Sequence, residues 1–339
     1  MTASPVPLLL VVDGNSLLHR AYHAAATGRL VDDAGRAVWA IKGLITHVAH
    51  AAAQLRPDAV LIGFDCLEHS VRKADDAGYK AQRPDKPADL QEQLAVAPDL
   101  VRATALPVVV PVGYEADDVL ASSAAKARES SWRTVVVTSD RDAFALIDPT
   151  TSVLRVRNGG RGASVLVTAA SLPEVCGVEA WQYRDYAALR GDPSDNLLGV
   201  PGFGSATAAR LLAEFGTVDA AWAALDGGAG ERVRAAVGDH AAAQFATPAA
   251  REIVARNRRL MRMRTDLPLP DLDTMRLPVA LPVMRRALAE HGIRLGPSLW
   301  ALTGGSPPPE ESPADLTWTR ASLASSRSRR PGPDQLALF

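Results

Sequence analysis

The sequence has almost no net charge, few cysteines and no long apolar run. Its 339 residues carry a formal net charge of −1, which does not point to a nucleic-acid partner, although an average can conceal separate acidic and basic regions. Cys66 and Cys176 are too few for a disulfide framework and favour a reducing compartment. No apolar stretch could span a membrane, and no basic region precedes the first apolar run. We therefore expect a cytoplasmic protein without a membrane partner.

Short apolar runs alternate with helical segments from residue 8 onward. The predicted strands are Leu8–Val12, Ala59–Phe64, Val108–Pro111, Thr134–Thr138 and Ser152–Val156. The predicted helices are Val38–Gln54, Asp89–Ala103 and Asp117–Arg128. Runs this rich in Val, Leu and Ile are typical of buried parallel strands. We predict an α/β fold in which helices flank a parallel sheet.

Three further segments depart from this alternation. Residues 66–87 are polar and basic, and we interpret them as an insertion above the strand ends. The region after residue 170 is predicted to be helical up to residue 303. Residues 304–339 are rich in Pro, Ser and Gly, which predicts a disordered tail. The predicted regions are therefore 1–170, 171–303 and 304–339.

Nine carboxylates follow predicted strands, begin helices or lie in a loop near a glycine-rich turn. They are Asp13, Asp65, Glu115, Asp117, Asp118, Asp140, Asp142, Asp192 and Asp195. Parallel strands bring their carboxyl ends to one edge of the sheet, where ligands bind. Clustered carboxylates repel one another unless cations lie between them, and oxygen ligands suit Mg²⁺ or Mn²⁺. Two such ions can hydrolyse a phosphodiester without a protein nucleophile, so the sequence predicts a metal-dependent phosphodiesterase.

Each of these signals has a simpler alternative when it is taken alone. Glu115, Asp117 and Asp118 begin a predicted helix, where acids are common because they favour the helix dipole. Six arginines between Arg251 and Arg264 could contact phosphates or form a solvated helix face. The complete set of nine acids has no comparable alternative, because their repulsion stabilises nothing without cations.

The turn Gly199–Gly204 resembles a helix–hairpin–helix turn within about residues 185–215. Its glycines allow backbone N–H groups to approach a phosphate, and the next helix adds its N-terminal dipole. A turn rich in Gly and Pro is weak support by itself. The residues expected to contact DNA here are Gly199, Val200, Gly202, Gly204, Ser205 and Thr207.

Together these motifs resemble the 5′ nuclease family, which includes the 5′–3′ exonuclease domain of bacterial DNA polymerase I and the flap endonucleases. They occur in the family's order between about Leu8 and Pro270. The matching segments are Val12–Gly14, Phe64–Asp65, Gly78–Arg83, Gly113–Ala121, Thr138–Asp142, Gly191–Asn196 and Gly199–Gly204. Single motifs are modest support, but the ordered set is specific.

The resemblance implies a PIN-like fold that holds two divalent metals, Mg²⁺ or Mn²⁺. It assigns Asp13, Asp65, Glu115, Asp117 and Asp118 to one metal, and Asp140, Asp142, Asp192 and Asp195 to the other. The insertion corresponds to a helical arch in which Lys80, Arg83 and Arg72 steer and polarise the scissile phosphate. Tyr22 lies where the family places an aromatic that can stack on a base, and the hairpin is expected to bind K⁺.

The sequence also departs from the family pattern. Ala206 replaces a lysine that many relatives carry, which removes one expected phosphate contact. No polymerase region follows, so the chain resembles a free-standing exonuclease. The C-terminal residues Gln335, Leu336, Leu338 and Phe339 resemble the bacterial peptide that binds the sliding clamp.

The expected activity is cleavage at 5′ flaps, nicks and RNA–DNA primer junctions in replication and repair, by a monomer. Two alternatives remain: a catalytically weak DNA-junction module tethered to the clamp, and a PIN-type RNase. The complete acid set argues against the first, and the arch and hairpin argue against the second.

Overall fold

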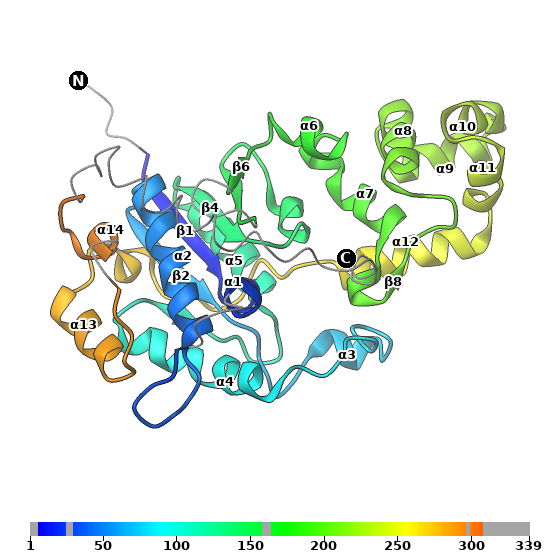
Figure 1. Ribbon diagram of the computed structural model, residues 1–339. Helices are drawn as coiled ribbons and strands as arrows, with labels where there is room; N and C mark the ends of the chain where they lie inside the picture. The colour runs from blue at the N-terminus through cyan, green and yellow to red at the C-terminus, as the bar shows by residue number, and fades with distance from the viewer. Residues whose placement is uncertain (1–5, 25–29, 158–163, 296–298, 308–339) are drawn as a thin grey trace, which may run out of the picture. The chain divides into compact units, whose positions relative to one another are not determined.

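A six-stranded sheet forms the centre of the first half of the chain (Figure 1). The computed structural model describes residues 6–24, 30–157, 164–295 and 299–307. In sheet order the strands are β3 (Val108–Val109), β2 (Ala59–Gly63), β1 (Leu8–Asp13), β4 (Arg133–Thr138), β5 (Thr151–Arg155) and β6 (Val165–Val167). All pairs are parallel except β5 with β6. The α/β fold and the five predicted strands are confirmed, whereas β6 is too short for its sequence to reveal it.

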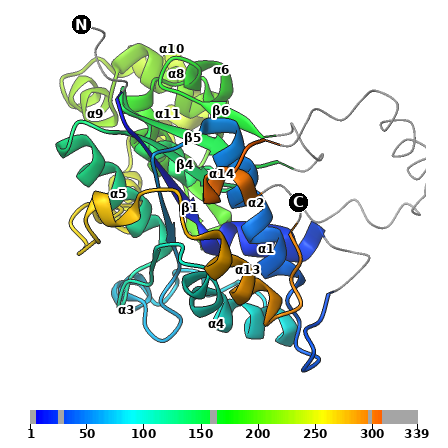
Figure 2. The same cartoon turned by 90° about the vertical axis from the view of Figure 1, so that its left-hand side faces the viewer.

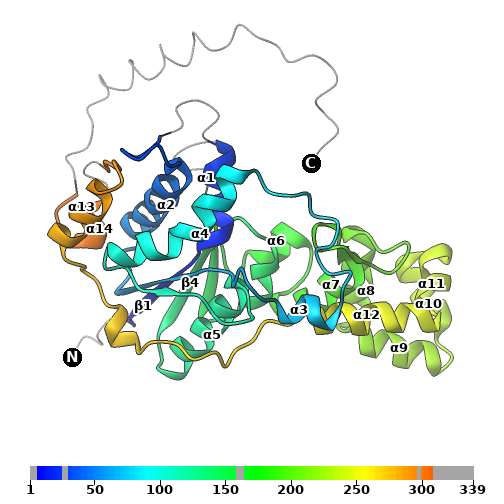
Figure 3. The same ribbon diagram turned by 90° about the horizontal axis from the view of Figure 1, so that it is seen from below.

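Helices cover both faces of this sheet, as Figures 2 and 3 show. Every residue of β1 is buried, and its residues alternate between two apolar clusters. Leu9 and Val11 pack with α5 (Ala116–Glu129). Leu10 and Val12 pack with α2 (Trp39–Leu55) and α4 (Ala88–Ala103). A strand that is buried on both sides appears as a continuous apolar run, which is why β1 was easy to predict.

The helix α1 (Gly14–Ala24), which was not predicted, begins directly after β1. Gly14 favours a loop assignment by propensity, but here it permits an abrupt turn from strand to helix. A Cβ atom at Gly14 would lie 2.6 Å from the ring of Phe64 and 2.8 Å from the carbonyl oxygen of Gly63. The glycine therefore lets the chain pass close to β2 and directs α1 across the strand ends.

The second region is helical, as predicted. Its helices are α6 (Leu172–Cys176), α7 (Tyr183–Arg190), α8 (Ser205–Phe215), α9 (Val218–Asp226), α10 (Gly230–Val237), α11 (Asp239–Phe245) and α12 (Pro248–Leu260). A hairpin with the short strands β7 (Gly191–Asp192) and β8 (Leu197–Leu198) joins α7 to α8. The fully buried Asn257 of α12 donates hydrogen bonds to the carbonyls of Ala188 and Leu198, which fixes the hairpin against α12.

The last helices return to the sheet. Met284 and Leu288 of α13 (Leu281–Ala289) and Leu302 of α14 (Trp300–Thr303) join the apolar cluster of α2 and α4. The helices α13 and α14 therefore pack with the first region, although the sequence assigned them to the second. An amphipathic helix indicates that one face will be buried, but not which surface will cover it.

The insertion and the tail differ in what the structure describes. Residues 66–87 contain one short helix, α3 (Val71–Asp75), followed by turns. Most of the predicted tail, with Gln335–Phe339, lies outside the described residues. Among the described residues, no helix is both long and apolar enough to cross a membrane.

Candidate metal centre and nuclease site

The first group of carboxylates lies where β1 and β2 end. Asp13 is 4% exposed, and it accepts hydrogen bonds from the backbone N–H of Ser16 and the hydroxyl of Thr138, both at 2.8 Å. Asp65 accepts from the amide of Asn15 at 2.9 Å and from the backbone N–H of Ala116, at the start of α5, at 2.8 Å. These bonds hold both acids in fixed orientations.

These acids do not ionise together easily, because they are buried and repel one another. Burial raises the pKa of Asp13 to about 7, and the charges of Asp65 and Asp140 add to the rise. Burial also raises the pKa of Asp65, and it raises the pKa of Asp117 well above its ordinary value, with Asp13 and Asp140 contributing. A cation among these carboxylates would offset both the burial and the repulsion. The first group therefore fits a metal ion in chemistry and in charge.

The second group lies beyond β4 and in the hairpin. Carboxylate oxygens of Asp142, Asp192 and Asp195 lie within 4.8 Å of one another. Burial raises the pKa of Asp142 well above its ordinary value, and Asp140, Asp192 and Asp195 raise it further. Asp140 is exposed beside them, and its Oδ1 accepts the backbone N–H of Asp142. An all-oxygen group of this size suits a hard divalent cation.

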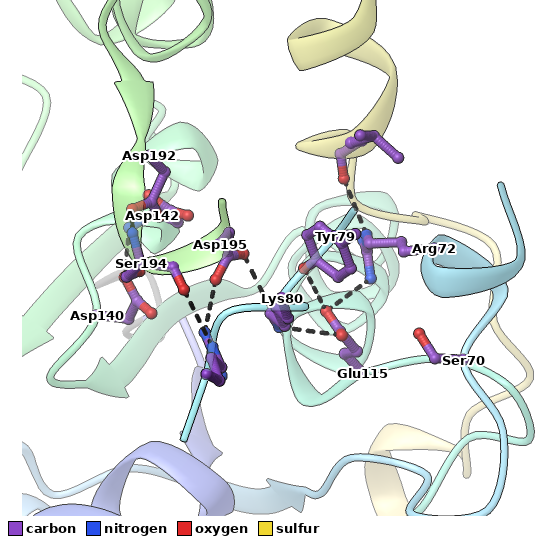
Figure 4. A network of polar contacts seen from close by, with 12 residues as sticks. Ser70, Arg72, Tyr79, Lys80, Glu115, Asp140, Asp142, Asp192, Ser194 and Asp195 are labelled. Atoms are coloured by element: carbon purple, nitrogen blue, oxygen red, sulfur yellow. Dashed lines mark hydrogen bonds and ion pairs between the residues drawn. The ribbon is translucent and has the colours of Figure 1, made fainter. Parts of the chain in front are cut away.

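The insertion places a lysine between Glu115 and the second group of carboxylates, as Figure 4 shows. The Nζ of Lys80 lies 3.0 Å from Oε1 of Glu115 and 3.9 Å from Oδ2 of Asp195. Burial disfavours its charge, but Glu115 and Asp195 outweigh this and raise the pKa of Lys80. Its backbone has a φ of +55°, and its N–H donates to the carbonyl of Asp195. Arg83, half-exposed, donates to Asp195 and to the carbonyl of Ser194.

Arg72 and Asp118 form a pair of their own beside Glu115. The guanidinium of Arg72 is bound by Asp118 and Glu115 and by two backbone carbonyls, and its side chain is 12% exposed. All N–H groups of the Arg72 guanidinium are paired within the protein, and its contact with a phosphate stays a prediction. Asp118 is fully buried and accepts from Arg72 with both oxygens, and the Arg72 nitrogen that binds its Oδ2 also binds Glu115.

The predicted aromatic platform is already packed. The ring of Tyr22 stacks on Trp39 with centroids 5.4 Å apart, and its hydroxyl donates to Asp89 at 2.7 Å. The side chain is half-buried, so a base could reach only the ring surface that Trp39 leaves uncovered. The contact between Tyr22 and a nucleobase stays a prediction.

The helix–hairpin–helix turn Gly199–Gly204 and the start of α8 expose part of the surface that was predicted to contact DNA. Gly202, Gly204 and Ser205 are exposed and Thr207 is half-buried, whereas Val200 is buried and could contact DNA only through its backbone. The φ of Gly202 is +85°, which favours glycine. A Cβ atom on Gly199 would lie 2.2 Å from the carbonyl oxygen of Arg190, so this glycine is needed for the hairpin to approach α7.

Several residues that orient the acids were missed from the sequence. Asn15 and Thr138 bind Asp65 and Asp13 directly, and the hydroxyl groups of Ser16 and Ser139 are 2.5 Å apart at the same edge. The hydroxyl of Tyr79 donates to Glu115 at 3.0 Å. Thr138, Ser139 and Tyr79 lie in segments that match the family pattern, whereas the only signal for Asn15 and Ser16 was their position near Asp13.

Two family models match consecutive parts of the chain. The 5′–3′ exonuclease N-terminal resolvase-like domain matches residues 8–174, and the 5′–3′ exonuclease C-terminal SAM fold matches residues 178–280. The chain belongs to the 5′–3′ exonuclease family. This membership confirms the predicted family and makes the chain a hydrolase of the nuclease class.

Relatives of this family extend well beyond the present chain. DNA polymerase I of Mycobacterium leprae is 35% identical over 274 residues, which are 80% of this chain and 28% of the relative. The thermostable DNA polymerase I of Thermus aquaticus is 36% identical over 265 residues, which are 78% of this chain and 29% of the relative. The chain thus spans less than a third of the length of these curated relatives.

Solved structures of nucleases share the fold. The T5 5′-exonuclease with bound zinc ions matches with a TM-score of 0.58 and 18% identity, covering 94% of this chain and 98% of that one. The catalytic core of Rad2 in complex with a DNA substrate matches with a TM-score of 0.54 and 15% identity, covering 88% and 92%. At this identity the likeness shows the fold, and it confirms the predicted α/β class.

The raised carboxyl pKa values predict how metal affects stability. In the metal-free protein the pKa of Asp13 rises from 3.8 to about 7 on folding. Between these values the folded state binds more protons than the unfolded state, so the free energy of unfolding falls as pH rises. Bound Mg²⁺ should remove this fall and stabilise the protein more at high pH than at low pH.

Urea unfolding across this pH range, in EDTA and in Mg²⁺, measures the effect. The difference between the two curves isolates the site from carboxylates elsewhere, such as Asp148, whose pKa is lowered. Parallel curves would contradict metal binding by these acids.

Proposed function

We propose that the chain is a divalent-metal-dependent, structure-specific 5′ nuclease that removes 5′ flaps and RNA primers in replication and repair. The observation that carries this proposal is the placement of two carboxylate groups at the strand ends with Lys80 between them. The T5 relative, solved with divalent metal ions, and the Rad2 relative, solved with a DNA substrate, support the same reading.

The metal ions would be held in two places. Asp13, Asp65, Glu115 and Asp117 fit one Mg²⁺ or Mn²⁺, and Asp140, Asp142, Asp192 and Asp195 fit another. When bound, such ions supply an activated water and neutralise charge on the phosphate and the leaving oxygen.

The protein's own groups orient the acids and the phosphate. Asn15 fixes Asp65, and Thr138 fixes Asp13, so neither carboxylate must reorganise during the reaction. Lys80 is restrained by Glu115 and Asp195. We infer that cations among the acids weaken this restraint and leave the Lys80 ammonium available to a phosphate oxygen.

The helix–hairpin–helix turn Gly199–Gly204 would hold the duplex part of the substrate. Exposed glycines and the N-terminus of α8 offer backbone N–H groups to a phosphate, with K⁺ as the expected bridging cation. Arg210 on α8 places a cation one turn beyond Ala206, with its guanidinium 3.5 Å from the hydroxyl of Thr207.

Replacing Gly202 by valine should weaken binding of duplex-containing substrates. The φ of +85° at this position strains any β-branched residue, so the hairpin must change its backbone. Fluorescence anisotropy should show that the variant binds a flap substrate more weakly than the wild type and binds a short single strand equally well. Replacing Gly228, a positive-φ glycine with no neighbour within 4 Å of its Cβ position, is the control. Equal losses on both substrates would point to misfolding.

A panel of 5′-labelled substrates tests the proposed function. A flap, a nicked duplex, a primer with a 5′ RNA segment, a blunt duplex and a single-stranded RNA should be compared in Mg²⁺. The proposal requires cleavage that depends on the junction. Binding without cleavage would favour the junction-module alternative, and preferred cleavage of single-stranded RNA would favour the PIN-type RNase.

The C-terminal peptide would recruit the nuclease to its substrate. Gln335, Leu336, Leu338 and Phe339 combine an apolar anchor with one polar group, and a tail of this composition can act as a tether. We expect a monomer that binds the sliding clamp through this peptide. Deleting Gln335–Phe339 should abolish clamp binding in calorimetry and leave cleavage of free flaps unchanged. Unaltered clamp affinity would reject this role.

A further inference from the structure

Arg72 joins three segments that are far apart in the sequence. Its Nε donates to the carbonyl of Leu260 at 2.9 Å, and one terminal nitrogen donates to the carbonyl of Arg262 at 3.1 Å. The two terminal nitrogens also donate to both oxygens of Asp118 at 2.7 Å, and one reaches Glu115 at 3.1 Å. These contacts engage the whole guanidinium fork, so Arg72 ties the insertion to the start of α5 and the end of α12.

Asp118 is saturated by donors of the protein itself. Besides the two bonds from Arg72, its Oδ1 accepts the backbone N–H of Arg264 at 2.8 Å and its Oδ2 accepts that of Glu115 at 3.1 Å. Successive helix residues point about 100° apart. Asp117 therefore faces the carboxylates at the strand ends, whose charges act on it, while Asp118 faces α12.

The helix α12, whose end Arg72 contacts, is in turn bound to the β7–β8 hairpin. Leu260 is the last residue of α12, and Asn257, one turn earlier, donates to the carbonyls of Ala188 and Leu198. Arg256 donates to the same carbonyl of Leu198 at 3.0 Å. Polar contacts thus link the hairpin to α12, and Arg72 links the end of α12 to Glu115 and the start of α5.

We propose that Arg72 and Asp118 are a positioning pair that holds the metal-binding acids and the hairpin region in a fixed register, and that Asp118 is not a metal ligand. This inference rests on the proposed nuclease function only for its catalytic readout. A planar guanidinium can bind a carboxylate with two parallel bonds and reach two carbonyls, whereas a lysine ammonium cannot. Small displacements of reacting groups lower rates far more than they lower affinity.

The test combines metal binding with single-turnover cleavage. Binding of Mn²⁺ to the full chain without DNA, followed by electron paramagnetic resonance, should weaken at least about tenfold in Asp117→Asn. In Asp118→Asn it should change less than about threefold, because Glu115 keeps Tyr79 and Lys80 as partners. At saturating flap and Mg²⁺, Asp118→Asn and Arg72→Lys should both cleave about 100-fold more slowly, with flap affinity within about threefold of the wild type.

One control variant and one alternative variant distinguish loss of the pair from loss of folding. Arg128→Lys, also on α5 and paired with Asp148 at 2.7 Å, should match the wild type in every measurement. If Asp118→Asn fails to fold, the double variant Arg72→Met/Asp118→Leu removes both charges together, and it should fold, bind Mn²⁺ and remain slow.

Equal losses of Mn²⁺ affinity in Asp118→Asn and Asp117→Asn would overturn the proposal. A wild-type cleavage rate in Arg72→Lys would also overturn it, because charge alone would then be sufficient. A wild-type chain that binds Mn²⁺ but cuts no substrate would refute the proposed function instead, and the metal-binding comparison would still decide the role of Asp118.

Discussion

Replacing Asp142 by asparagine should lower the single-turnover rate of flap cleavage by at least about 100-fold while flap binding persists. Carboxylate oxygens of Asp142, Asp192 and Asp195 lie within 4.8 Å of one another, and burial raises the pKa of Asp142 well above its ordinary value. The amide removes one negative charge and one ligand oxygen, so the second metal ion should bind weakly. Part of the lost rate should return as the metal concentration rises.

The measurement is quench-flow cleavage of a 5′-labelled flap over a series of Mg²⁺ concentrations. Asp99→Asn, at a residue whose carboxylate is 86% exposed on α4, is the control and should be unchanged. If Asp142→Asn reaches the wild-type rate at limiting Mg²⁺, the second group of acids does not hold a metal.

Replacing Lys80 by alanine should lower the single-turnover rate about 100-fold and weaken flap binding much less. Lys80 lies between Glu115 and Asp195 in Figure 4, 3.0 Å from the first and 3.9 Å from the second. A cation that acts on the reacting phosphate stabilises the transition state more than the bound substrate. Arg83→Ala should show a smaller loss, because its side chain is 47% exposed and contacts only one acid group.

Lys73→Ala is the matched control for Lys80, since it removes the same charge from an exposed position of the same insertion. Saturating substrate and metal must be used, so that affinity does not enter the rate. If Lys80→Ala loses only affinity and keeps its rate at saturation, Lys80 is an electrostatic anchor and takes no part in the chemistry.

The sequence was most informative where strand patterns and acids coincide. Asp13, Asp65 and Asp140 follow apolar runs, and the rule that parallel strands end at one edge was enough to predict that they lie close together. The hairpin acids Asp192 and Asp195 were less certain, because a loop can lie anywhere, and only the structure places them beside Asp142.

The sequence could not distinguish Asp117 from Asp118. Both begin the same helix, and the difference between them depends on Arg72 and on the end of α12, which lies more than 140 residues away from Asp118. The same limit applies to Lys80, whose ion pairs with Glu115 and Asp195 depend on how the insertion folds back over the strand ends. Long-range polar contacts of this kind leave no periodic pattern in a sequence.

We propose that the acids at the strand ends form a divalent-metal centre that cuts DNA at 5′ junctions. The most direct test is cleavage of a 5′-labelled flap by metal-free protein during titration with Mg²⁺, with EDTA as the reference. A nuclease with this metal centre should not cleave in EDTA, and its rate should rise more steeply than in proportion to Mg²⁺ because two ions are required. Full cleavage in EDTA, or none at any concentration of Mg²⁺ or Mn²⁺, would contradict it.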